Sequence, residues 1–362
     1  RIFINTDPNI DLFMPTTALP SVTRCHYLDN LKVLLTVLVV FHHAGQAYGD
    51  GGAWPYSPSL SHEYVGWLGN FFPVNAAFFM GLFFLISAYF IPGSLDRSGT
   101  KQFVRKRAIR LGVPMLVVLI LSLSVTGKAE FAHTWFLEHL LFYSLAYVCI
   151  YEACRKYEWG LKRDRRLNLL RVLLLAAGLS AVTYYVRLEN PIDHWKMLGG
   201  FLSSEPAHLP QYVLMFALGI VAYRNDWFGS LSPSVGKVLL AVAGLMVLLV
   251  YLRPVYPFLG NNIWKNWWWY EALLCLSLSF GLIYLYRVRF NRTSPFRRWL
   301  ADQAYGVYFF HLFVIIGLQY AFDGFDMGSG TVKFLFIGIC ATVMSFALVY
   351  LARSIPGMKR VL

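Results

Sequence analysis

The sequence has few charged residues for its length. Only 14% of its 362 residues are Asp, Glu, Lys or Arg, whereas 57% are hydrophobic. A water-soluble domain of this size does not need so large an apolar fraction, so the composition argues against one. Apolar runs of roughly 18 to 22 residues recur along the chain, as in proteins that cross a membrane many times as helices. The sequence therefore predicts an all-α, polytopic bundle of transmembrane helices.

Paired cysteines are also lacking. The five cysteines include no Cys-x-x-Cys pair, and four of them lie within or at the ends of apolar runs. This pattern argues against a disulfide framework and a zinc site, so we expect no bound metal. The first 20 residues contain no apolar core of the signal-peptide kind, and we expect the first spanning helix to stay in the mature protein.

The loops between apolar runs differ in their positive charge. On alternate sides of the runs, 26 Lys and Arg residues lie on one side and 6 on the other. By the positive-inside rule the richer side is cytoplasmic, and it holds both termini. The net charge of +13 then reflects topology, and no nucleic-acid partner is expected. The ten predicted spans are approximately 31–48, 67–91, 108–127, 134–154, 168–188, 209–224, 236–252, 263–286, 303–322 and 331–352.

These spans set the predicted domains. Residues 27–354 form the membrane domain, preceded by a cytoplasmic segment over residues 1–26. Residues 355–362 form a cytoplasmic tail. The predicted outer loops are too short to fold alone.

The first predicted span carries polar residues on a single face. A helix turns about 100° per residue, so Lys32 and His43 lie only about 20° apart around its axis. Asp29 and Thr36 lie about 40° and 20° from His43, whereas His42 points about 100° away. Ionisable groups inside a membrane are costly and by default mark a functional pathway. His43 is a candidate general base, and a core histidine bonded to a neighbouring helix is the alternative.

Other polar residues are grouped at helical spacing. Arg107 and Arg110 lie three apart at a predicted cytoplasmic boundary, where they suit phosphate oxygens or lipid head groups. Tyr305, Tyr308 and His311 are spaced by three and share one helical face. Taken alone, such groups most often form interhelical hydrogen bonds. The same structural interpretation is the simpler one for Ser87, Glu138 and His139.

Aromatic residues gather on the predicted outer side. They suit a belt at the membrane–water interface, and the alternative is a platform on which sugar rings stack. The residues concerned are Trp54, Tyr56, Trp67, Trp195, Trp264, Trp267, Trp268 and Trp269.

Taken together, these motifs resemble the acyltransferase-3 family of integral membrane acyltransferases. That family opens with Leu-Asp-x-x-Arg/Lys, ten further residues and a histidine, matched here from Leu28 to His43. The order and spacing of the motifs fit over residues 27–315. The later motifs are Phe83-Phe84-x-x-Ser87-Ala88, Arg107-x-x-Arg110 before Pro114, Trp135-Phe136-Leu137, and Tyr305-x-x-Tyr308-x-x-His311. The stretch from Phe41 to Tyr48, together with Trp54-Pro55-Tyr56, further resembles the subgroup of glucan-biosynthesis protein C.

The resemblance implies an O-acyltransferase of the bacterial inner membrane, surrounded by lipid. Its donor would be cytoplasmic acyl-CoA, with acetyl-CoA or succinyl-CoA foremost, and its acceptor a hydroxylated glycan or small molecule. His43 would remove the acceptor proton, by direct transfer or within an acyl relay on the protein. The implied catalytic residues are His43, Asp29, Tyr305 and His311, and the implied donor-binding residues are Lys32, Arg107 and Arg110.

Two of these roles are specified further, and two positions depart from the motifs. Tyr305, Tyr308 and His311 would steady the oxyanion or position the acceptor. Lys32 replaces the commoner arginine, so it would meet phosphate as a point charge. Ala88 replaces a glycine, which predicts a slightly wider helix contact.

The competing functional class is a transporter or flippase, in which the polar stripe of the first span relays ions or protons.

Overall fold

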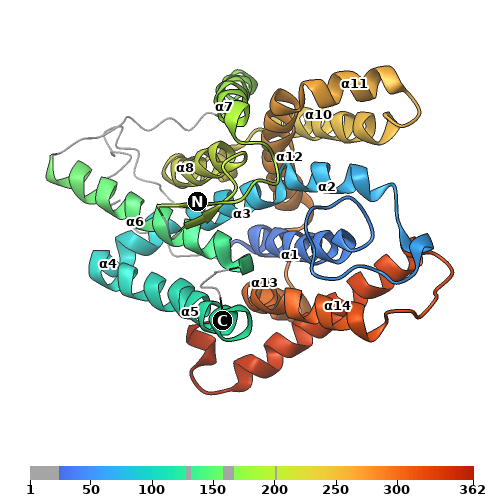
Figure 1. The fold of residues 1–362 in the computed structure, drawn as a ribbon. Coiled ribbons are helices and arrows are strands. Elements are labelled where there is room, and N and C mark those ends of the chain that lie inside the picture. Colours follow the sequence, from blue (N-terminus) through green and yellow to red (C-terminus); the bar gives the residue numbers. More distant parts are fainter. Residues whose placement is uncertain (1–23, 128–131, 158–166, 200–201) are drawn as a thin grey trace. The chain divides into compact units, whose positions relative to one another are not determined.

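The computed structural model describes residues 24–127, 132–157, 167–199 and 202–362 (Figure 1). The predicted cytoplasmic segment over residues 1–26 lies mostly outside these residues. The chain divides into two compact units, which are described separately. The first unit comprises Arg1–Cys25 and Gly81–Leu239, and the second comprises His26–Met80 and Leu240–Leu362.

The second unit is built around three long helices. α1 (His26–Gln46), α13 (Pro295–Ala321) and α14 (Gly330–Ser354) contact one another and lie side by side (Figure 1). Small residues permit this close approach, because a Cβ at Gly338 of α14 would come within 2.7 Å of the Phe41 ring. The unit also contains α2 (Leu68–Ala76), α11 (Pro257–Lys265), α12 (Trp267–Arg289), and parts of α3 (Phe79–Tyr89) and α10 (Pro233–Leu252).

The first unit holds the remaining helices. Its α8 (Leu209–Asn225) packs closely on α3, because a Cβ at Gly219 would come within 2.3 Å of the Leu85 carbonyl oxygen and 2.7 Å of the Ala88 Cβ. A glycine on the partner helix thus leaves room for the alanine that departs from the motif. The helices are α4 (Ile91–Arg107), α5 (Val113–Thr126), α6 (Trp135–Lys156), α7 (Leu169–Glu189), α8 (Leu209–Asn225) and α9 (Trp227–Ser230).

A buried ion pair connects α4 and α8 within the first unit. Arg224 donates from Nη1 and Nη2 to the Asp96 carboxylate at 2.6 and 3.0 Å. Nη2 also donates to the Tyr147 hydroxyl at 3.3 Å. The two charged side chains are 3% and 2% exposed, a burial that charges tolerate only when paired and hydrogen-bonded.

The membrane-protein prediction is confirmed in its main features. Eight helical segments in the described part of the chain are long and apolar enough to cross a membrane. Two further helices coincide with predicted spans, but α6 carries four charged residues and α8 has only 17 residues. The count of ten spans and the cytoplasmic termini therefore stay predictions.

The all-α prediction misses one short sheet. β1 (Lys196–Leu198) pairs antiparallel with β2 (Leu202–Ser204). Its stability comes from α6, because the Ser203 N–H donates to Glu138 Oε2 at 3.0 Å and His139 Nε2 lies 3.1 Å from Ser204 Oγ. Three-residue strands carry too little periodicity to be read from sequence. Glu138 and His139 thus contact this hairpin, whereas the sequence favoured hydrogen bonds to another helix.

Candidate active site

Two histidines from distant parts of the sequence meet in the second unit. His43 lies in the last turn of α1 and His311 lies in α13. Their ring centroids are 4.9 Å apart, and His311 Nε2 is 3.4 Å from His43 Nδ1. His311 is buried, whereas His43 is half-buried. The polar stripe of α1 therefore ends at a histidine pair.

Backbone carbonyls determine which ring nitrogens carry protons. His43 Nδ1 is 2.9 Å from the Val39 carbonyl oxygen, and His311 Nδ1 is 2.7 Å from that of Tyr308. A carbonyl oxygen only accepts, so we assign the proton of each neutral ring to Nδ1. The His311 Nε2 lone pair then faces the His43 Nδ1–H. His43 Nε2 carries the other lone pair, as a general base requires.

His42 has a different environment, as its orientation on the helix predicted. Its Nδ1 lies 3.2 Å from Nδ2 of Asn75 in α2, which donates to it. Its ring stacks on Phe79 at 5.1 Å between centroids, with 28° between the planes. His42 is therefore a packing residue between helices.

The loop between α1 and α2, residues 47–67, is here called the strap. It carries Trp54, whose ring centroid is 5.9 Å from that of His43. Trp54 Nε1 donates to Gln319 Oε1 at 2.7 Å, and Gln319 Nε2 donates to the Ala44 carbonyl oxygen at 3.2 Å. Gln319 is fully buried, so this bridge ties the indole to the backbone beside the histidine.

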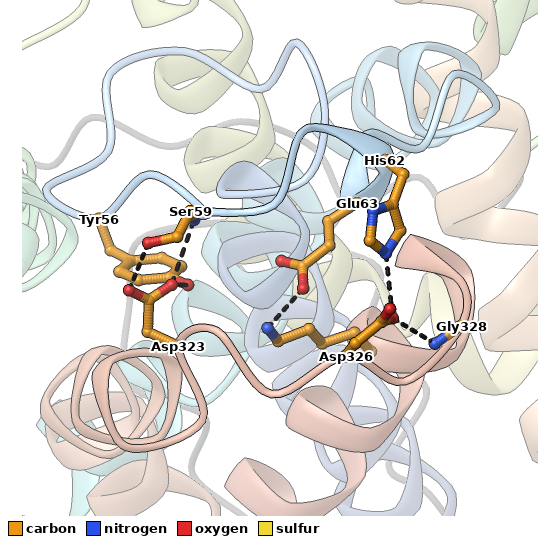
Figure 2. Close-up of polar contacts among 8 residues, drawn as sticks. Tyr56, Ser59, His62, Glu63, Asp323, Asp326 and Gly328 are labelled. Carbon is orange, nitrogen blue, oxygen red and sulfur yellow. Dashed lines mark hydrogen bonds and ion pairs between the residues drawn. The ribbon is translucent and has the colours of Figure 1, made fainter.

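Polar contacts hold the strap against the α13–α14 connection, as Figure 2 shows. Asp323 accepts from the Tyr56 hydroxyl at 2.7 Å and from Ser59 Oγ at 2.6 Å. Asp326 Oδ1 lies 3.0 Å from His62 Nε2 and accepts from the Gly328 N–H at 2.7 Å. These contacts restrain the segment that carries Trp54.

A buried ion pair fixes the same segment. Lys333 Nζ in the first turns of α14 lies 2.5 Å from Glu63 Oε1, and the two side chains are 1% and 2% exposed. Gly330 allows the strap to come this close, because a Cβ there would lie 2.0 Å from the Glu63 carbonyl oxygen. The strap backbone therefore rests directly on the start of α14.

The pKa of Asp323 provides a test of the strap contact. Hydrogen bonds from Ser59 and then Tyr56 lower this pKa from 3.8 to about 2. A carboxyl with a depressed folded-state pKa stabilises the fold above its unfolded pKa and loses that contribution as the pH falls through the folded value. We expect the strap amides near residues 56–59 to lose protection as the pH falls from about 4 to about 2.

Hydrogen exchange, corrected for intrinsic rates, would measure this loss. In Asp323→Asn the amide cannot titrate, so strap protection should be lower at neutral pH and should change less across the same interval. An identical pH response in the wild type and in Asp323→Asn would contradict this assignment.

Asp29 and Lys32 pair with each other at the start of α1. Lys32 Nζ is 2.8 Å from Asp29 Oδ1, across one helical turn. Asp29 lies about 21 Å along the axis from His43, because a helix rises 1.5 Å per residue. Its neighbour is thus the lysine, and any effect of Asp29 on the histidine is indirect.

The tyrosines of the last motif differ in their surroundings. Tyr308 is buried and its carbonyl oxygen holds the His311 ring, whereas Tyr305 is half-buried one turn earlier on α13. The α13 face predicted from the spacing of three thus includes His311, and His43 meets it from α1. The roles of both tyrosines stay predictions.

Arg107 and Arg110 belong to the first unit. Arg107 ends α4, with its guanidinium carbon 5.4 Å from the Phe103 ring centroid. Arg110 is exposed on a π-helical turn, Ala108–Gly112, that links α4 to α5. Such turns occur often at functional sites. The sequence predicted the basic boundary but missed α4 as a helix, because its polar composition reads as a loop.

Several residues of this region were not singled out from sequence. Gln319 and Lys333 are polar residues within apolar runs, which is a usable signal for a buried interaction. Glu63 lies in a polar loop and gives no such signal. In the described residues no group of three or more metal-binding side chains is close enough to hold an ion.

Eight apolar helical segments long enough to span a membrane are the mark of an integral membrane protein. A sequence profile described as Acyltransferase domain matches residues 26–353. The chain belongs to the acyltransferase-3 family.

Relatives within this family are distant. Glucans biosynthesis protein C of Escherichia coli O81 (strain ED1a) is 24% identical over 295 residues, which cover 72% of each chain. The protein of the same name from Escherichia coli (strain K12) is 24% identical over 292 residues, again covering 72% of each chain. No solved structure matches the chain.

Proposed function

We propose that this protein is a membrane O-acyltransferase that moves an acyl group from cytoplasmic acyl-CoA to a hydroxyl of an extracytoplasmic glycan or other acceptor. The observation that carries the proposal is the histidine pair within a family of acyltransferases. The acceptor class follows the name of the relatives, which refers to glucans. The location is the bacterial inner membrane, with ten spans and both termini in the cytoplasm.

His43 acts as the general base. Its Nε2 takes the proton of the acceptor hydroxyl while the oxygen attacks the thioester carbonyl carbon. The carbon–sulfur bond then breaks, and the CoA thiolate leaves with the proton returned by His43. The lone pair of His311 Nε2, 3.4 Å from His43 Nδ1, together with the Val39 carbonyl oxygen stabilises the imidazolium that forms between these events.

The donor binds through its phosphates. Lys32, Arg107 and Arg110 supply the positive charges, and Asp29 positions Lys32 through their ion pair. Lys32 and His43 lie about 16 Å apart along α1, a span comparable to the pantetheine arm. The arm therefore follows the polar stripe from the phosphates to the histidine.

The direct test is acyl-CoA turnover by the purified protein in nanodiscs. Acetyl-, succinyl- and longer acyl-CoAs are followed by free-thiol release, with and without glycan acceptors. We expect one donor class to release thiol, and faster with an acceptor. Neither binding nor release with any donor, in protein shown to be folded, would overturn the proposal and favour a transporter.

Arginine substitutions test the donor site. We expect Arg107→Ala or Arg110→Ala to weaken acyl-CoA binding by roughly 1.5 to 3 kcal/mol, the usual strength of a hydrogen bond to a charged group. Calorimetry in detergent would measure this affinity. Arg105→Ala is the matched control, because Arg105 is an exposed arginine of α4, two residues before Arg107. If Arg105→Ala loses as much acyl-CoA affinity, the loss reflects the overall positive charge of this surface and not a specific site. Unchanged affinity in both Arg107→Ala and Arg110→Ala would contradict the assignment.

A further inference from the structure

Trp54 lies at the edge of the apolar core of the second unit, beside His43. Its ring is half-buried, lies on the strap and stands beside the ring of His43. A tryptophan that only filled the core would be buried on all sides. Trp54 is only half-buried, and its ring stands next to the group that the proposed function uses as the base.

The indole is also held in place. Its N–H donates to fully buried Gln319, which donates in turn to the Ala44 carbonyl oxygen, one residue after His43. The part of the strap that follows Trp54 is restrained by Asp323, through Tyr56, and by the buried Glu63–Lys333 pair. A ring fixed in this way loses little conformational entropy when a ligand stacks on it.

The charges around the strap limit the ligand. Asp323 is an exposed carboxylate, and its low pKa keeps it ionised at neutral pH. Asp326 is exposed as well, and its pKa is lowered by the Gly328 N–H and by His62. Carboxylates accept hydrogen bonds from hydroxyl groups and repel anions. A neutral polyhydroxylated ligand fits this surface, and a phosphorylated one does not.

We propose that Trp54 is the stacking platform for the acceptor, and that the acceptor is a neutral sugar ring. One face of the ring lies on the indole, and a hydroxyl at its edge meets His43 Nε2. The transfer step in this proposal rests on the proposed function, whereas sugar binding does not depend on it. Gln319 is the positioning residue that sets the angle of the indole.

Binding is tested first, without any donor. The probe is laminarihexaose, a neutral glucose oligomer, added to the full chain in nanodiscs and followed by saturation-transfer NMR. We expect Trp54→Ala to weaken binding about tenfold and Trp54→Phe to weaken it less, because a smaller aromatic face remains. Trp299→Ala is the matched control, since Trp299 is another half-buried tryptophan of the second unit, near the start of α13, and it should bind as the wild type does.

Transfer is tested second, with glycerol as an acceptor that has no ring face. We expect Trp54→Ala to lower kcat/KM for laminarihexaose about tenfold more than for glycerol, mainly through KM. Equal losses for both acceptors, or a loss of donor-only thiol release, would assign Trp54 to the donor and overturn the platform.

The two proposals fail in different ways. Trp54-dependent binding of laminarihexaose without thiol release from any donor would keep the platform and overturn the acyltransferase mechanism. If the wild type transfers an acyl group to glycerol but binds no oligosaccharide, the acyltransferase mechanism is kept and the platform is overturned. Oligosaccharide binding that is unchanged in both Trp54 variants would overturn the platform.

Discussion

Replacing His43 with alanine is expected to lower acyl transfer by about 10²- to 10⁴-fold, the usual contribution of a general base. The variant keeps Lys32 and both arginines, so donor binding should change little. Thiol release in the presence of acceptor measures the rate, and calorimetry with acyl-CoA checks that the donor still binds.

His42→Ala is the matched control for this prediction. His42 is the adjacent residue on α1, but its Nδ1 accepts a hydrogen bond from Asn75 Nδ2 and its ring stacks on Phe79. The nitrogen lone pair that a base needs is therefore already occupied. We expect it to retain most of the transfer rate. A larger loss in His42→Ala than in His43→Ala would show that the base has been assigned to the wrong histidine.

His311 should matter through its partner. His311→Phe keeps a ring of similar size but removes the Nε2 that lies 3.4 Å from His43 Nδ1. We expect a fall in kcat smaller than that of His43→Ala, with little change in donor affinity. A loss of folding in this variant would be visible by size-exclusion chromatography, and His311→Gln then offers a second polar replacement.

The second large effect concerns stability. Lys333→Met should destabilise the protein by about 3 to 5 kcal/mol, because it leaves the buried Glu63 carboxylate without its counter-charge. The loss should be greatest around the strap, where the ion pair joins residues 270 positions apart. Thermal unfolding in detergent measures the overall change, and hydrogen exchange locates it.

The double variant separates charge from packing. In Glu63→Gln with Lys333→Met no buried charge remains, so we expect much of the lost stability to return. Lys265→Met is the control, since Lys265 is an exposed lysine of the same unit and should change stability by no more than about 0.5 kcal/mol. A double variant as unstable as the sum of its parts would contradict the ion-pair assignment.

Helix periodicity was enough to separate the two adjacent histidines. An eleven-residue spacing placed Lys32 and His43 on one stripe and turned His42 away from it. The structure agrees, because His42 packs on Phe79 while His43 meets His311. This inference succeeded because the relation is local to one helix, where backbone geometry alone fixes the direction of each side chain.

The contacts around His43 could not be predicted from helix periodicity. His311 is 268 residues from His43, and Gln319 is 265 residues from Trp54. The resemblance named His311 as a site residue but assigned it to the oxyanion or the acceptor, not to the histidine itself. Periodicity says nothing about which helix face meets another helix, so these pairs depend on packing.

The sequence by itself determined the class of protein, the positions of most long helices and the polar face of the first one. Its apolar runs must satisfy their own backbone hydrogen bonds in lipid, and a helix is the simplest way to do so. Only the tertiary structure decided that His43 is partnered by His311, that the strap carries Trp54 to this pair, and that a buried Glu63–Lys333 contact holds it. Those contacts join segments far apart in the chain, and their geometry is set by close packing between helices, which no local pattern encodes.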